Sequence, residues 1–226
     1  MSPVRILGTV EGPLREKLDN AVVRAAQLRG MEVPTAAIIR GKQVYAYASN
    51  RDPRDVQCVN ISAGAITKFD EDELTASVVR AFSSNGAARP RSSSLKSVAA
   101  LVLSLYGAMF VAMPVVLGSQ VPKAAFHRVV GIVAVGCGML AGAFVLQAKS
   151  AGQQRRLEFD ADAETAQVMA DPDLVARMIA KSPKAPVEYL GPAKALFNPV
   201  SSIPSRAQRI EMLRQNSSAV QGLQAA

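Results

Sequence analysis

The chain has 226 residues, 49% of them hydrophobic and 19% charged, with a formal net charge of +8. No basic stripe with interleaved aromatic residues is present, which argues against nucleic-acid binding. The two cysteines, Cys58 and Cys137, form no CxxC pattern, so we expect neither a disulfide nor a cysteine-bound metal. The apolar residues exceed those of an ordinary soluble domain and must be concentrated in part of the chain.

The N-terminal part has the pattern of one helix followed by strands. Residues 11–29 carry apolar side chains at helical spacing and stop at a glycine, which predicts an amphipathic helix. Apolar runs at 36–40 and 43–48 lie on either side of a Gly-Lys pair and predict a β-hairpin, and 57–62 alternates like a further strand. No apolar stretch opens the chain, so we expect no signal peptide.

A second helix is predicted from Glu71 into the early eighties. Asp70 is a suitable N-cap, and Glu73 three residues later completes a capping box. The segment 85–94 is rich in Gly, Pro and Ser and predicts a linker. The expected buried stripe of this helix consists of Leu74, Val78 and Phe82.

Two uncharged runs, Ser97–Gly118 and Val129–Ala148, are each long enough to cross a bilayer as a helix and predict a transmembrane hairpin. The alternative is a pair of buried helices in a soluble core. Small residues suit close helix packing in lipid, and the second run contains Gly131, Gly136, Gly138 and Gly142.

Basic residues predict the orientation of this hairpin. They flank its outer ends at Arg89, Arg91, Lys96, Lys149, Arg155 and Arg156, against only Lys123 and Arg128 in the connecting loop. By the positive-inside rule, both soluble segments face the cytoplasm. We therefore expect an integral membrane protein with two spans.

The segment after the hairpin is predicted to be helical. Residues 156–170 have a helical pattern, and Asp171 with Pro172 caps a further helix that runs through Ile179. The tail 215–226 has little to bury, and we expect it to be mobile.

Four motifs in this order resemble the HtpX-type membrane metalloproteases, zincins related to the CAAX prenyl proteases. QVYAYASNRDPRDVQCVNISAGAI is similar to a stretch with an NAFA element and a strand before SGLL, and FDEDEL to the LDEDEL that lies five residues before HExxH. RRLEFDADAETAQVM is similar to RExEADRxAA, which carries the third zinc ligand. SSIPSRAQRIEMLR resembles STHPPTEERIxRLR, and the four together span residues 25–214.

The zinc-binding residues of the family are missing here. Counted without a gap, the HExxH positions include Arg80, Ala81 and Ser84, which offer neither imidazole ligands nor a general base. The resemblance assigns Glu158 to the remaining ligand position and Asp162 to the carboxylate that orients a ligand. Ile203 replaces a histidine of the family, whereas Pro204 and Arg209 persist. We therefore expect zinc to be lost, with no catalytic residue left.

Other metal-binding residues are scarce. The single histidine, His127, falls in the predicted loop between the spans and is typical of an interfacial polar residue. Two interpretations remain open for the acidic residues near the third motif: a hard-cation site, or carboxylates favoured in the first turns of a helix. These residues are Glu158, Asp160, Asp162 and Glu164.

Arg80 leads to a structural hypothesis. Without zinc, two carboxylates would face a partly buried pocket unpaired, which is unfavourable. Arg80 either lends its guanidinium to Glu158 or Asp162, replacing the charge of the metal, or points to solvent.

The predicted fold class is α+β, mainly α: a zincin-like cytoplasmic domain interrupted by a two-helix transmembrane hairpin. Residues 1–95 and 150–214 form its two halves, and 96–149 form the hairpin. The leading functional hypothesis is a membrane-anchored, inactive relative of the peptidases that binds a peptide or protein, with the strand at 56–62 as the edge to which a peptide would add. The alternatives are an active metallopeptidase with an atypical site and a scaffold subunit that pairs with itself or an active paralogue.

Overall fold

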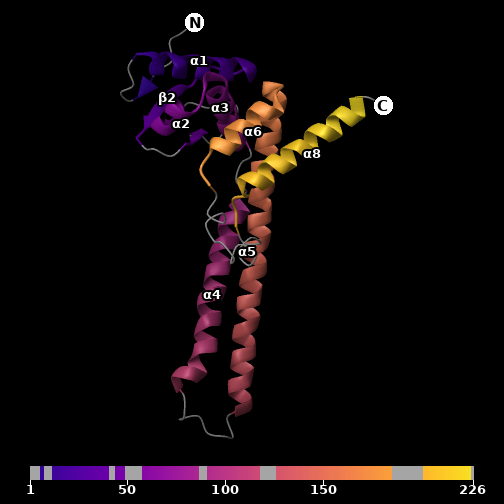
Figure 1. The fold of residues 1–226 in the computed structure, drawn as a ribbon. Helices are drawn as coiled ribbons and strands as arrows, with labels where there is room; N and C mark the ends of the chain where they lie inside the picture. Colours follow the sequence, from indigo (N-terminus) through magenta and orange to yellow (C-terminus); the bar gives the residue numbers. More distant parts are fainter. Residues whose placement is uncertain are drawn as a thin grey trace. The chain divides into compact units, whose positions relative to one another are not determined.

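The computed structural model describes residues 6–7, 12–40, 44–48, 58–86, 91–117, 126–184 and 201–224. The chain forms two units, whose elements are labelled in Figure 1. A compact unit combines Met1–Ala88, Arg155–Gly191 and Ile203–Ala226, and a helical unit includes Arg89–Gln154. Segments far apart in the sequence thus belong to one compact unit. The architecture is mainly helical with one small mixed sheet, which confirms the α+β, mainly α, prediction.

The sheet of the compact unit has the strand order β1-β2-β4-β3. The strands are β1 (Ile6–Leu7), β2 (Thr35–Ile39), β3 (Ala46–Ala48) and β4 (Cys58–Ser62). β1, β2 and β4 are parallel neighbours, and β3 is antiparallel to β4. The predicted hairpin is therefore wrong: both apolar runs form strands, but β4 lies between them. Val59 and Ile61 of β4 are fully buried, so burial at the centre of the sheet outweighs the short local connection.

The edge of the sheet also differs from the prediction. β4 pairs with a neighbour on each side, so it is a central strand and has no free edge for a peptide. β3 is the outermost strand of the described sheet on that side.

Local signals explain how the first helices begin and end. α1 (Pro13–Leu28) confirms the first predicted helix, and Gly30 after it has a φ of 61°, a left-handed conformation that glycine adopts without strain. α2 (Ala63–Lys68) was not predicted from the sequence. Its N-cap is Ser62, whose Oγ accepts a hydrogen bond of 3.1 Å from the amide of Ala65.

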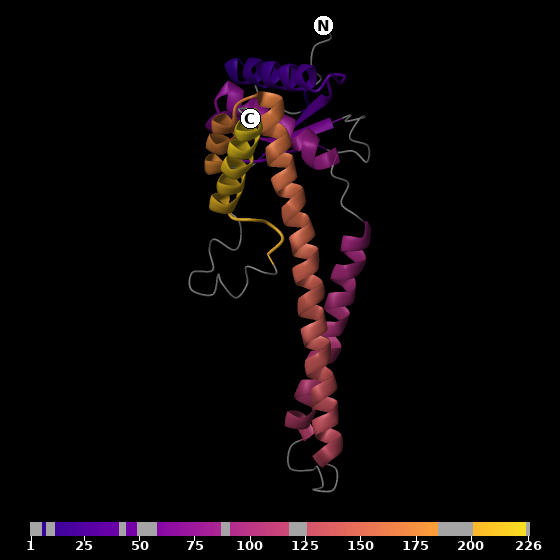
Figure 2. The same ribbon diagram turned by 90° about the vertical axis from the view of Figure 1, so that its right-hand side faces the viewer.

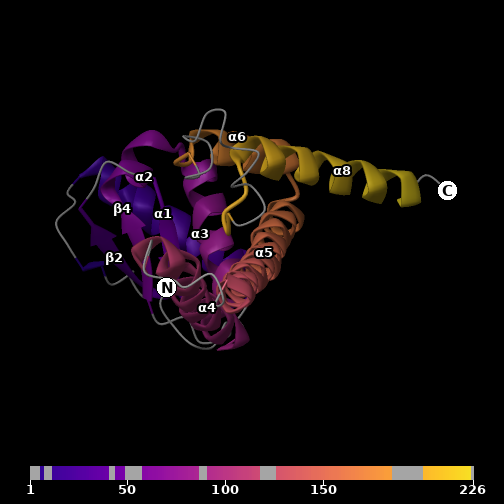
Figure 3. The same ribbon diagram turned by 90° about the horizontal axis from the view of Figure 1, so that it is seen from below.

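α3 (Glu71–Gly86) is the central helix of the compact unit. The capping box is confirmed: the Glu73 amide donates to Asp70 Oδ1 at 2.8 Å, and the Asp70 amide donates to Glu73 Oε2 at 3.0 Å. Every residue from Glu73 to Ser83 except Arg80 is buried, including the predicted stripe. α3 contacts α1, β3 and α6, and Figure 3 shows α3 with α1 and α6 near it.

The last helices of the compact unit follow from capping residues. α5 (Phe126–Met169) ends before α6 (Pro172–Lys181), and Asp171 caps α6 by accepting from the Leu174 amide at 2.8 Å, as predicted. α8 (Arg206–Gln224) lies beside α6 and continues past residue 215, where the tail was expected to begin. The core includes Leu18, Val22, Val59, Ile61, Leu74, Val78, Phe82, Val175 and Ile179.

In the helical unit, α4 (Arg91–Leu117) lies against the first part of α5, as Figures 1 and 2 show. A Cβ added at Gly107 of α4 would lie 2.9 Å from the Gly136 carbonyl oxygen, and one at Gly136 would lie 2.9 Å from the Gly107 oxygen. These two glycines therefore allow close approach of the backbones. α4 begins at Arg91, so the C-terminal part of the predicted linker 85–94 is helical.

One described helix, His127–Met169, is long and apolar enough to cross a membrane by length and composition. Val98–Pro114 of α4 is a shorter apolar helix. The large apolar side chains of both helices are mostly exposed within the structure, among them Leu101, Leu105, Met109, Val135 and Val145. Cys137 lies on α5 and Cys58 on β4.

A buried arginine–carboxylate cluster as the candidate functional site

Arg80 lies on the face of α3 that is turned toward α5. It follows the buried run Leu74–Val79, and the exposed fraction of its side chain is 19%. The helix positions this long cation inside the compact unit because its apolar neighbours are fixed in the core.

Two carboxylates from α5 face Arg80. Glu158 and Asp162 are four residues apart and therefore share one side of their helix. The Asp162 side chain is only 3% exposed, whereas Glu158 is 33% exposed. The acidic residues lie well inside α5, so the interpretation as first-turn carboxylates is wrong; the sequence did not reveal that the apolar run and this segment form one continuous helix.

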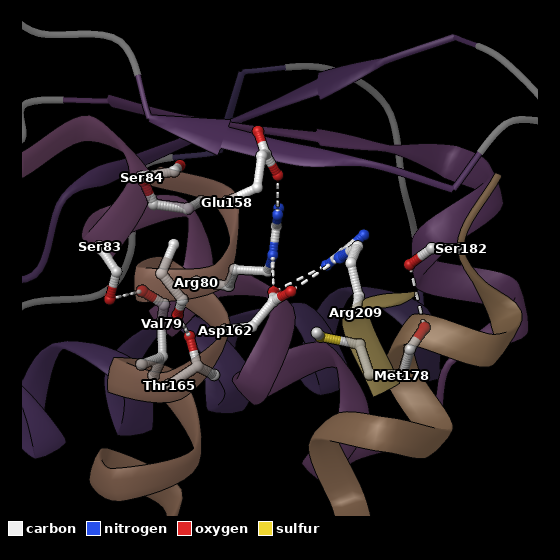
Figure 4. Close-up of polar contacts among 12 residues, drawn as sticks. Val79, Arg80, Ser83, Ser84, Glu158, Asp162, Thr165, Met178, Ser182 and Arg209 are labelled. Carbon is white, nitrogen blue, oxygen red and sulfur yellow. Dashed lines mark hydrogen bonds and ion pairs between the residues drawn. The ribbon is translucent and has the colours of Figure 1, made fainter. Parts of the chain in front are cut away.

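Arg80 bridges these two carboxylates. Its Nε donates to Asp162 Oδ1 at 2.6 Å, and its Nη2 donates to Glu158 Oε2 (Figure 4). The hypothesis that Arg80 pairs with Glu158 or Asp162 is thus confirmed for both, and the solvent-directed alternative is wrong. A charge that is largely removed from water requires such partners.

Arg209 completes the cluster from α8. Its Nε and Nη2 donate to the two oxygens of Asp162, each at 2.7 Å, in a bidentate arrangement. Ser205 and Gln208 position this residue: the Ser205 amide donates to Gln208 Oε1 at 3.0 Å and the Gln208 amide donates to Ser205 Oγ at 3.3 Å. This S-x-x-Q capping box is a sequence signal that would have predicted the start of α8.

The electrostatics favour the ionised forms of Asp162 and Arg80. Burial opposes ionisation of Asp162, but the charges and hydrogen bonds of Arg80 and Arg209 outweigh it and lower the pKa of this carboxyl. Burial likewise opposes the charge of Arg80, and Asp162 and Glu158 outweigh it, so the pKa of Arg80 is raised. Asp162 lies beyond the apolar stretch 129–148 of α5, in the compact unit.

The residues of this site do not fit a zinc ion. Ala81 is buried in the core, and Ser84 Oγ donates to the Ala81 carbonyl of its own helix at 3.0 Å. Arg80 presents only donors to the space that a cation would need. In the described part of the chain, no group of three or more His, Cys, Asp and Glu side chains could hold a metal ion.

The remaining candidate residues lie elsewhere. Glu164 accepts from Nη1 of Arg29, the residue that follows α1, and Asp160 is exposed. The four acids therefore do not converge on one point. His127 lies in the first turn of α5 rather than in a loop.

A second buried carboxylate lies at the other end of α3. Glu73 is fully buried, and its Oε2 accepts from Lys181 Nζ of α6 at 2.5 Å in addition to its role in the capping box. Sequence reasoning missed this pair because it joins residues 108 positions apart. The FDEDEL motif therefore fixes α3 against α6.

A cavity of about 230 Å³ opens beside the arginine–carboxylate cluster within the compact unit. Its lining includes Ala46, Arg80, Glu158, Met178, Lys184 and Arg209. Phe82 belongs to the core and is not part of this lining. We call this cavity the cleft.

No protein-family model, curated protein or solved structure matches the chain. The residues of the cluster and the cleft are therefore the basis for a functional proposal.

Proposed function

We propose that the chain is a membrane-anchored, catalytically inactive relative of the HtpX-like zinc peptidases, which binds a peptide or protein partner in the cleft. The observation that carries this proposal is the position of Arg80. It occupies the first ligand position of the degenerate motif and pairs with Glu158 and Asp162, the two carboxylates that the resemblance places around zinc. The charge of an arginine takes the place of the charge of a metal ion.

The second part of the proposal is a membrane anchor of two spans with both soluble segments in the cytoplasm. The composition of α5, the exposed apolar side chains of α4 and α5, and the close approach at Gly107 and Gly136 support it. The basic residues outside the two apolar runs support the cytoplasmic orientation.

The third part is peptide binding without cleavage. An extended peptide can add to the edge of a sheet through backbone hydrogen bonds, and this mode needs no metal. β3 is the outer strand on that side, and its first residue, Ala46, lines the cleft. The cleft and the edge strand are therefore adjacent parts of one binding surface.

Metal analysis of the full-length protein in detergent tests this function. We expect wild type without zinc, and a triple variant with Arg80→His, Ala81→Glu and Ser84→His that contains one zinc per chain. The variant restores two imidazoles one helical turn apart and a carboxylate between them. Stoichiometric zinc in wild type would contradict the proposal and favour the active metallopeptidase, and a variant without zinc would contradict the zincin-like geometry.

A scaffold subunit of a membrane assembly is the second candidate function. Within the described residues, a Cβ added at Gly131, Gly138 or Gly142 of α5 meets no atom within 4 Å, unlike one at Gly136. These glycines leave room for a second helix to approach. Cross-linking in native membranes tests this candidate, and a chain that is monomeric at all concentrations would remove its support.

A further inference from the structure

We propose that the cleft binds the free C-terminal carboxylate of an extended peptide whose last side chain is apolar. The inference deepens the proposed function and rests on it, because it names the ligand of the same cleft. The unused donors of two arginines, the charge balance of the cleft, and its size and apolar lining support it.

Both arginines of the cluster retain unused hydrogen-bond donors. A guanidinium has five N–H groups, and Arg80 and Arg209 each use only Nε and Nη2 for the carboxylates. Among the described residues, no acceptor bonds to Nη1 of either side chain. Figure 4 shows both guanidinium groups converging on Asp162 from different elements. Since both arginines line the cleft, their free N–H groups are available to a ligand there.

The charges around the cleft favour an anion. Arg80, Arg209 and Lys184 line it, and Glu158 is the acidic side chain of the lining. Asp162 lies against both guanidinium groups and adds a second negative charge. Three cations thus face two carboxylates, so one positive charge is left to balance a bound anion. A planar guanidinium binds a carboxylate with two parallel hydrogen bonds, which suits this chemistry.

The size of the cleft limits the ligand. A volume of about 230 Å³ is below that of sites for larger organic ligands, so it suits a carboxylate with one side chain. Phe69, Met178 and Ile203 supply apolar surface to the lining. A last side chain that is apolar would therefore contact this apolar part of the lining, while the carboxylate contacts the arginines.

The position of β3 favours a chain terminus over an acidic side chain. Ala46 begins this outer strand and also lines the cleft, so a peptide added along β3 reaches the cleft with its backbone. A peptide that ends there places its terminal carboxylate on the line of the strand. Binding through an internal Asp or Glu would instead require the chain to continue past a small cavity.

Titration of the full-length protein in detergent with labelled peptides tests the proposal. The probe is a pool of tetrapeptides ending in Leu, Val or Phe, with a fluorophore at the N-terminus and a free carboxylate. The same pool with a C-terminal amide is the matched control. We expect at least tenfold tighter binding of the acid pool by fluorescence anisotropy, because the amide lacks the charge that the arginines recognise.

A charge reversal at the rim provides the second readout. Lys184 is exposed, so Lys184→Glu leaves the core intact, and we expect it to weaken binding of the acid pool about tenfold and to leave the amide pool unchanged. Lys68→Glu makes the same change of net charge at an exposed position of α2 outside the cleft lining, and we expect no effect.

Equal binding of the acid and amide pools would overturn the proposal, and so would no binding of either pool. Inorganic phosphate that binds as tightly as the acid pool would show an anion site that does not recognise a peptide terminus, which also overturns it. Failure here is distinguishable from failure of the proposed function. If wild type contains no zinc and the triple variant contains zinc, the proposal of an inactive relative stands, whatever the result of the peptide titration.

Discussion

In the compact unit, Leu18, Val59 and Phe82 are buried to within 1% of their surface, whereas in the helical unit Leu105 and Val135 expose 64% and 54% of theirs. The compact unit also buries charged side chains. Asp162, Arg209 and Glu73 are buried there, each with an oppositely charged partner. A protein that folds against water buries its apolar residues and pairs the charges it buries. The helical unit exposes apolar side chains instead, which is the arrangement that the proposed membrane anchor requires.

The two units also hold their elements together in different ways. In the compact unit, hydrogen-bonded charged side chains join α3, α5 and α8, and Asp162 is shared by two arginines. In the helical unit, the absence of side chains at Gly107 and Gly136 allows α4 and α5 to approach. Removing a carboxylate should therefore destabilise the compact unit. Adding a side chain at Gly107 or Gly136 should destabilise the helical unit.

The largest effect is expected from Asp162→Ala. It leaves Arg209 buried without its acceptor and removes one partner of Arg80, so unfolding should become easier by about 3–5 kcal/mol. Chemical denaturation of the detergent-solubilised protein measures this change. Asp160→Ala is the matched control, because Asp160 is exposed on the same helix and should alter stability by less than about 0.5 kcal/mol. Similar losses in both variants would contradict the cluster.

A smaller effect is expected from Gly136→Val in the helical unit. The added side chain meets the Gly107 carbonyl oxygen and the side chains of Phe110 and Val111, so the helices must separate, at a cost of about 1–3 kcal/mol. Thermal unfolding in detergent is the measurement. Gly138→Val places the same group where no atom of the described chain lies within 4 Å and should be tolerated. If Gly138→Val is equally damaging, the glycines have another partner.

The coupling between Arg80 and Glu158 should be about 1 kcal/mol, because water reaches one third of the Glu158 side chain and weakens the pair. A double-mutant cycle with Arg80→Ala and Glu158→Gln measures it. The double variant should lose less stability than the sum of the single variants. Additive losses would mean that Arg80 depends on Asp162 alone.

The smallest effect on stability near neutral pH is expected from protonation of Asp162. The pKa of this carboxyl is lowered in the folded state, so its contribution to stability is complete above its unfolded pKa of about 3.9 and is lost as the pH falls below that value. Asp162→Asn should abolish this component. We therefore expect the stability curves of the two proteins to run parallel from pH 7 to about pH 5 and to converge in acid. Curves that stay parallel below about pH 4 would show that Asp162 does not contribute.

Local patterns in the sequence were sufficient for much of this structure. α1, α3 and α6 lie where periodicity and capping residues predict them, since these signals act over a few residues. An argument about unpaired charge offered Glu158 or Asp162 as a partner of Arg80 but left a solvent-directed side chain open, and the structure decided between them. α2 was not predicted because it is only six residues long and directly follows β4, so its sequence resembles the end of that strand.

The sequence by itself determined the helix caps, the apolar runs and the residues of the cluster. Only the tertiary structure decided that β4 inserts between β2 and β3, that Arg209 shares Asp162 with Arg80, and that Glu73 pairs with Lys181. The physical reason is range: caps and periodicity depend on neighbouring residues, whereas strand order and buried ion pairs depend on which distant surfaces exclude water together.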